Sequence, residues 1–255
     1  MTARPAYAGG VHYSRANQII RVSGEILITL GVIIFLFIGY ELWFTGLYTQ
    51  HAQSALNKQL KSEWNAAAAT PAAPASATPS AGPSASSVPS SPPSVAEVLL
   101  PGDAVGIIRI PRLGASYGYA IVEGVSTDDL KKGPGHYPGS ALPGGVGNFV
   151  ISGHRTTYLA PFNGLGNLVV GDAIVIETRD TYDTYRVTKT EVVLPTQVGV
   201  VLPVPDKPHA KPTQALITLT TCTPKYSASH RLVVEGVLES ALPKAAGLPP
   251  ALKGA

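Results

Sequence analysis

The stretch ALITLTTCTPKYSASHRLVVEG, residues 215–236, holds two apolar runs separated by a turn-forming segment. Residues 215–222 alternate apolar side chains with threonines, which is typical of a half-buried β-strand, and a second apolar run begins at Arg231. We expect the two runs to form antiparallel strands. Because successive side chains of a strand face opposite ways, Cys222 shares a face with Thr218 and Thr220. We interpret that face as a polar groove rather than core.

Cys222 is the only cysteine of the 255 residues, which excludes an intramolecular disulfide and a cysteine-rich zinc site. The strand pattern leaves two interpretations open, an inert buried thiol or a nucleophile. A nucleophile needs a proton partner and a donor for the developing oxyanion. His154 follows the strand-like run GNFVISG at a tight turn and can project over a neighbouring strand end. Arg231 is the candidate oxyanion donor, with an ordinary surface arginine as the alternative. We interpret His136 and His230 as solvated loop histidines.

The composition indicates that part of the chain lies outside a globular core. Charged residues make up 14%, and the 26 glycines and 23 prolines together make 49 residues. The net charge of +3 is too small to indicate nucleic-acid binding, and no block of basic residues supports it.

The N-terminal part predicts a membrane anchor followed by a linker. Residues 26–48 are mostly apolar, long enough to cross a bilayer of roughly 30 Å, and end in an aromatic cluster. A cleaved signal peptide is the alternative, although no small-residue cleavage site follows directly. Basic residues before the span place residues 1–25 in the cytoplasm and the remaining chain outside. We assign residues 49–96, rich in Pro, Ala and Ser, to a disordered linker that lifts the domain off the membrane.

The folded domain is expected at residues 97–240 and to be mainly β. Short strand-like runs separated by Gly, Pro and Asp occur without helix–strand alternation, at residues 105–110, 119–124, 147–153, 173–178, 185–194, 215–221 and 231–239.

Short helices and loops are expected between and after these strands. Residues 126–133 predict a short helix capped by Ser126, and residues 161–168 predict another. Residues 198–205 are interpreted as a loop covering the core or the substrate. Residues 241–255 are expected to be a flexible C-terminal tail.

With these residues in place, the sequence resembles the sortases. TLTTC at 218–222, followed by Arg231 in RLVVEG, resembles their cysteine–arginine signature, and SGHRTTYLAPF at 152–162 resembles the histidine segment of their class E, found in actinobacteria. The resemblance covers roughly residues 100–240. It implies an eight-stranded sortase-type β-barrel with short helices, preceded by one transmembrane helix and a linker.

The resemblance also implies an activity. Cys222 would cleave the Thr–Gly bond of a sorting signal, LAxTG or LPxTG in type, on a secreted protein and form a thioester. An amine of a peptidoglycan precursor would then take up the protein. His154 would be the acid and base, Arg231 would hold the oxyanion and the signal, and Thr220 and Thr221 would shape the substrate groove. We expect no metal, no cofactor and no nucleic-acid partner.

Two alternatives remain. A cysteine transpeptidase of the L,D type would carry a serine–glycine–cysteine context, where this chain has TTCTP. A membrane-tethered binding module with an inert cysteine would tolerate the loss of Cys222.

Overall fold

The computed structural model of the protein describes residues 15–69 and 99–254, and it describes their side chains except those of residues 16, 41–44 and 67–69. Residues 1–14 of the expected cytoplasmic segment and residues 70–96 of the expected linker therefore lie outside the described residues.

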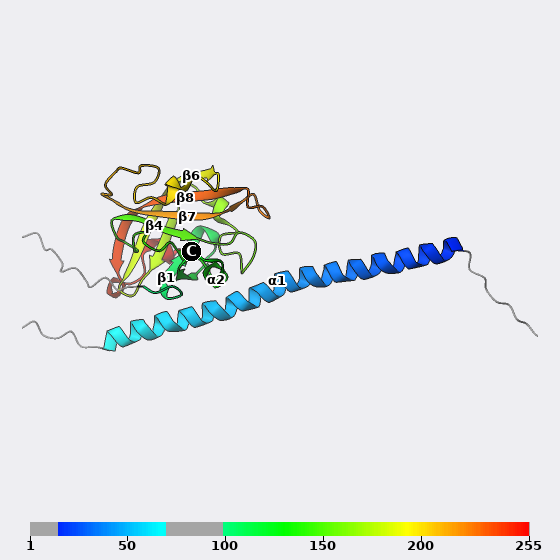
Figure 1. Cartoon of the computed structure of the whole chain (residues 1–255). Helices are drawn as coiled ribbons and strands as arrows, with labels where there is room; N and C mark the ends of the chain where they lie inside the picture. Colours follow the sequence, from blue (N-terminus) through cyan, green and yellow to red (C-terminus); the bar gives the residue numbers. More distant parts are fainter. Residues whose placement is uncertain (1–14, 70–98, 255) are drawn as a thin grey trace, which may run out of the picture. The chain divides into compact units, whose positions relative to one another are not determined.

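Eight strands among the described residues form one closed barrel, which confirms the expected fold class. In chain order they are β1 Ala104–Arg109, β2 Tyr119–Glu123, β3 Gly135–His136, β4 Gly147–Ser152, β5 Ala173–Glu177, β6 Thr181–Val193, β7 Ala215–Thr223 and β8 His230–Pro243. Around the barrel they follow the order β1-β2-β3-β4-β7-β8-β6-β5. Figure 1 shows the neighbouring strands β4, β7, β8 and β6 of this order. Closure leaves no long unpaired edge, which protects a sheet of short strands from pairing with other chains.

The pairing is antiparallel except at two places. β2 pairs with β3, and β4 with β7, in parallel. β3 has only two residues, too few for an alternating pattern, so the sequence did not predict it. β6 begins at Thr181, four residues before the expected start, because a tight turn links it directly to β5.

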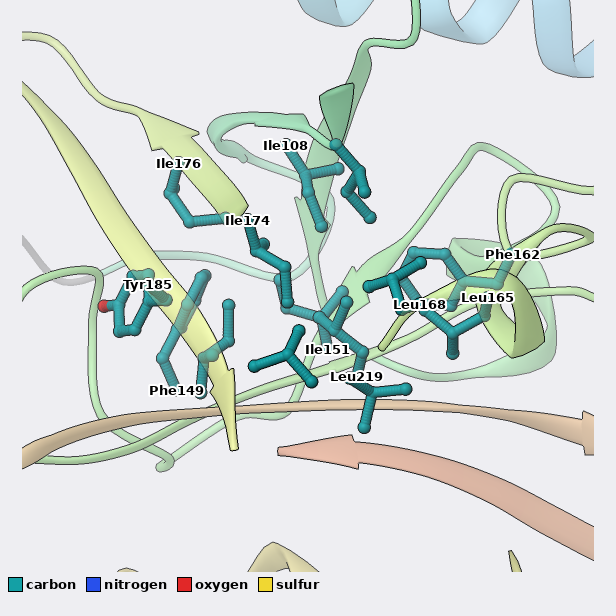
Figure 2. Packing of buried hydrophobic residues seen from close by; sticks show 14 of the residues in the cluster. Ile108, Phe149, Ile151, Phe162, Leu165, Leu168, Ile174, Ile176, Tyr185 and Leu219 are labelled. Atoms are coloured by element: carbon teal, nitrogen blue, oxygen red, sulfur yellow. The ribbon is translucent and has the colours of Figure 1, made fainter. Parts of the chain in front are cut away.

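The barrel interior holds the main core (Figure 2). Alternate residues of several strands point inward, among them Ile108, Phe149, Ile174 and Leu219, and each is fully buried. Phe162 and Leu165, from the connection after β4, extend this core next to the 3₁₀ helix η2, Leu165–Asn167. Ile151 near the end of β4 therefore belongs to the same apolar cluster as Phe162 and Leu165.

The helix expected at residues 126–133 is the four-residue α2, Thr127–Leu130, and within residues 161–168 only the 3₁₀ helix η2 forms. Ser126 caps α2, Thr127–Leu130, in a reciprocal capping box with Asp129, as expected. The remaining short elements are η1 Pro111–Leu113, η3 Val198–Val201, η4 Lys244–Ala246 and α3 Pro250–Lys253.

The face of β7 that carries Thr218 is covered, so its interpretation as a polar groove is wrong at that position. Thr218 is fully buried and donates a hydrogen bond of 2.8 Å to Asn148 Oδ1. Asn148 Nδ2 donates to the carbonyl oxygens of Val200 and Leu202 in the β6–β7 connection. The polar pair therefore attaches that connection to the outside of β4 and β7, and residues 198–205 cover the sheet as expected.

Two observed elements extend past the boundaries expected from the sequence. The helix α1, Arg15–Ala69, continues for 21 residues beyond position 48, and it contains a segment long and apolar enough to cross a membrane. β8 continues to Pro243, which pairs with Thr181, so the first residues of the expected tail belong to the sheet. From Thr45 onward the helix belongs to the same compact unit as the barrel.

Replacing Asn148 with leucine tests the attachment of the β6–β7 connection. Leucine has nearly the shape of asparagine, but it leaves the Thr218 hydroxyl and the carbonyl groups of Val200 and Leu202 without their partner. We expect this to cost about 2–4 kcal/mol of unfolding free energy. Chemical denaturation of the detergent-solubilised chain measures this. Adding Thr218→Val to Asn148→Leu removes one orphaned group, so the double variant should lose less than the sum of the single losses.

Candidate active site

The parallel pairing of β4 and β7 brings together residues 68 positions apart in the sequence. Ser152 lies opposite Thr220, and the next residues continue in the same direction. Gly153 donates its N–H to the Thr220 carbonyl at 3.1 Å, and Thr221 Oγ1 donates to the Gly153 carbonyl at 2.7 Å. His154 and Cys222 follow these residues by one position each, so both emerge at the same end of the barrel.

Cys222 and Arg231 lie directly opposite each other in the antiparallel pair of β7 and β8. The cysteine is a free, half-buried thiol. The Arg231 guanidinium donates from Nη1 to the carbonyl oxygens of Ala228 and His230, 3.0 Å each. Both bonds use Nη1, one of the three nitrogens of the planar guanidinium group. The structure thus places the three residues that the sequence singled out around one strand end.

His154 lies in a partly apolar environment. Its ring is 5.0 Å from the Tyr158 ring, centroid to centroid. Burial lowers the pKa of His154, because desolvation disfavours the charged imidazolium. Its Nε2 atom is buried and has no hydrogen-bond partner within the described part of the chain. A neutral imidazole at pH 7 is suited to accept a proton.

Arg155 is a site residue that sequence reasoning missed. Its Nη1 donates to the Cys222 carbonyl at 3.3 Å, so a second guanidinium lies beside the cysteine. Burial lowers the pKa of Arg155, while the proximity of Cys222 acts in the opposite direction. The available signal was its position directly after His154, in the loop that follows β4.

Thr220 and Thr221 are both buried. The Thr221 hydroxyl is already engaged with Gly153, so this residue links the two strand ends. A contribution of either threonine to the substrate groove stays a prediction.

The interpretation of His136 as a solvated loop residue is wrong. His136 lies on β3, is 2% exposed, and forms a hydrogen bond through Nδ1 with Glu123 of β2. Its Nε2 contacts Ser140 Oγ at 2.8 Å. The polar ring is buried because these partners satisfy both nitrogens, which a local sequence pattern cannot encode. His230 lies at the start of β8, and its Nδ1 contacts Ser229 Oγ at 3.0 Å.

One group of three carboxylates among the described residues has the spacing of a metal site. Oxygen atoms of Glu191, Asp206 and Glu235 lie within 4.8 Å of one another. The Lys189 ammonium is 2.6, 4.0 and 3.9 Å from them, respectively. The chain therefore supplies its own cation there, and the expectation of no metal stays a prediction.

Comparisons with known proteins point to one family. A family model described as "Sortase domain" matches residues 108–239. The chain is 33% identical over 242 residues to Sortase SrtE1 of Streptomyces coelicolor, a match that covers 91% of this chain and 60% of that protein. The chain thus spans less than two thirds of that relative's length.

Solved structures agree with this assignment. Sortase E from Streptomyces avermitilis superposes with a TM-score of 0.56 and 40% identity, over 60% of this chain and 99% of that chain. Sortase E1 from Streptomyces coelicolor, solved with a tripeptide in its active site, superposes with a TM-score of 0.55 and 36% identity. The match covers 61% of this chain and 99% of that chain.

Replacing Gly153 with alanine should displace the histidine segment. A Cβ there would lie 2.7 Å from Phe162 Cδ2, too close without a shift of the buried ring. We expect a loss of about 1–3 kcal/mol in unfolding free energy. Adding Phe162→Leu makes room, so the double variant should be less destabilised than the sum of the single variants; additive losses would contradict the clash.

The lowered pKa of His154 predicts a loss of stability in acid. The unfolded chain binds a proton at this histidine near pH 6.5, whereas the folded chain does so only at lower pH. The neutral folded form is therefore disfavoured as pH falls below about 6.5. Unfolding free energies of wild type and His154→Gln at pH 7 and pH 5 measure this. Between pH 7 and pH 5 the wild type should lose more unfolding free energy than His154→Gln. Equal losses in the two proteins would exclude a contribution of His154 to the pH dependence.

Proposed function

Because the chain belongs to class E of the sortase family of cysteine transpeptidases, we propose that it joins secreted proteins to the cell wall. It would cleave the Thr–Gly bond of a sorting signal of LAxTG or LPxTG type and transfer the threonine carbonyl to a peptidoglycan amine. The observation that carries the proposal is the convergence of Cys222, His154 and Arg231 at adjoining strand ends.

The first half of the reaction forms a thioester. Cys222 Sγ attacks the threonine carbonyl carbon, and the thiol proton passes to His154. The carbonyl electrons move to oxygen, where the Arg231 guanidinium stabilises the negative charge. The Thr–Gly bond then breaks, and His154 returns the proton to the leaving glycine amine. The lowered pKa of His154 supports this role, because a neutral imidazole can accept the proton and its conjugate acid releases it readily.

The second half regenerates the enzyme. An acceptor amine attacks the thioester carbon and loses a proton to His154. The C–S bond breaks, and the Cys222 sulfur recovers the proton. The half-buried position of the thiol supports this order, since it would limit the access of water to the thioester.

The anchor fits an enzyme that meets its substrates outside the cytoplasm. The apolar part of α1 would cross the membrane once, with the barrel on the extracellular side. There the lone cysteine has no intramolecular partner that could trap it as a disulfide. The partners would be secreted proteins with C-terminal sorting signals, a wall-precursor amine and the membrane.

Substitutions at the three residues should separate this function from a binding module with an inert cysteine. Cys222→Ala should abolish product, and His154→Ala and Arg231→Ala should each lower the rate by roughly 10²–10⁴-fold. His230→Ala, next to Arg231, is the matched control and should stay near the wild-type rate.

Intact mass spectrometry provides the direct test. The chain is incubated with an LAxTG or an LPxTG peptide without acceptor, and then with diaminopimelate or a glycine peptide. A peptide adduct on Cys222 that the amine releases supports transpeptidation. A reduced, folded protein without any adduct favours the binding module.

A further inference from the structure

Part of α1 packs against the barrel with one face. We define the docking segment as Thr45–Trp64. Within it, Thr49, Gln53, Leu56 and Leu60 are buried and recur every three or four residues, as on a single helix face. The two leucines form an apolar cluster with four residues of β1 and β2: Ala104, Ile107, Ala120 and Val122. At the far end, the Lys244 ammonium lies 3.4 Å from the centre of the Trp64 ring.

Gln53 takes the place of a missing strand neighbour. β2 pairs with β3 only at Val122 and Glu123, so the edge at Ala120 has no strand beside it. Gln53 Oε1 accepts the Ala120 N–H at 2.8 Å, and Gln53 Nε2 donates to the Ala120 carbonyl at 2.9 Å. The same nitrogen donates to the Lys132 carbonyl at 2.9 Å. The carboxamide thus behaves as a peptide group added to the sheet edge, with all its polar atoms paired.

Two further features show that the barrel is built for this contact. Thr49 Oγ1 donates to the Lys131 carbonyl at 2.7 Å. At Gly133, a Cβ would collide with Gln53 Nε2, so a larger residue there would force the amide to shift.

The residues next to Ala120 reach the loop that follows His154. Tyr119 donates its hydroxyl to the Leu159 carbonyl at 3.3 Å, and Tyr117 donates to the Pro161 carbonyl at 2.9 Å. Leu159 Cδ2 is also 3.7 Å from where a Cβ at Gly46 would lie, in the docking segment itself. The loop therefore lies close to Gly46 of the helix and is hydrogen-bonded to Tyr119 of the strand that the helix completes.

This loop has a conformation that its own sequence does not favour. Tyr158, Leu159 and Ala160 all have positive φ, at 52°, 60° and 44°. Left-handed backbone costs non-glycine residues roughly 1 kcal/mol or more each, so surrounding contacts must hold it in place. The Tyr158 ring packs on His154, so a shift of the loop moves the histidine.

We propose that the docking segment is an intramolecular positioning element that holds the His154 loop in its working arrangement. This inference rests on the proposed transpeptidase function. The continuous helix α1 would make the reactivity of the site depend on the docking of residues next to the membrane anchor. Gln53 is a positioning residue in this scheme, because it acts on His154 through β2 and the loop.

The test uses the full chain in lipid nanodiscs with Gln53→Glu. The change keeps the shape but replaces the donor by a carboxylate facing two carbonyl oxygens, which should undock the segment. Gln50→Glu, exposed one turn earlier on the same helix, is the matched control with the same charge. Thr49→Val is a milder second variant should Gln53→Glu fail to fold, since it removes only a hydroxyl.

Two readouts are combined. Hydrogen exchange of residues 118–123 reports docking, and exchange of residues 157–163 reports the loop. Single-turnover acylation of Cys222 by the LAxTG peptide reports catalysis. We expect faster exchange in both segments, unchanged exchange in β6 and β8, and acylation slowed roughly tenfold or more at saturating peptide with little change in KM. Gln50→Glu should match wild type in every readout.

Faster exchange at residues 118–123 with an unchanged loop and an unchanged acylation rate would overturn the proposal and leave the segment as a tether. Unchanged exchange at residues 118–123 would exclude the docking contact. If the wild type forms no adduct, the transpeptidase proposal fails, while the exchange data still decide whether the segment controls the loop.

Discussion

The site depends on the parallel pairing of β4 with β7. Three contacts fix the two strand ends: the register of Ser152 with Thr220, the bond from the Gly153 N–H and the bond from the Thr221 hydroxyl. Parallel neighbours end at the same edge of a sheet, so the residues that follow them emerge together. Without this pairing, His154 and Cys222 would share no surface. The buried Thr221 therefore helps to position His154 and Cys222, because its hydroxyl links the ends of β4 and β7.

The charges around Cys222 come from strand neighbours on both sides. Arg231 is opposite the cysteine on β8, and Arg155 reaches the Cys222 carbonyl from the β4 side. Arg231 donates to carbonyl groups of Ala228 and His230, and Arg155 donates to the carbonyl group of Cys222, so backbone contacts orient both guanidinium groups. Such preorganised positive charge favours states in which negative charge develops on sulfur or oxygen. Burial lowers the pKa of His154, so in the proposed mechanism its imidazole would accept a proton without adding a third positive charge at pH 7.

The short strand β3 has consequences beyond the barrel. Two residues of β3 leave part of the β2 edge unpaired, and a buried edge without partners is costly. The chain solves this with a helix side chain, Gln53, instead of a longer strand. The helix α1 that carries Gln53 also contains the segment long and apolar enough to cross a membrane. In the proposed scheme, the hydrogen bonds at this sheet edge would therefore link that segment to the loop beside His154.

The sequence alone determined the features that depend on local patterns. Alternating apolar residues located seven strands, Ser126 marked a helix start, and the neighbours of Cys222, His154 and Arg231 identified the family. Only the tertiary structure decided what covers each element. Thr218 is buried beneath the β6–β7 connection, His136 pairs with Glu123, and residues 49–64 pack on the barrel where composition indicated a linker. The physical reason is that periodicity encodes which side chains share a face, whereas the partner of that face comes from a distant part of the chain.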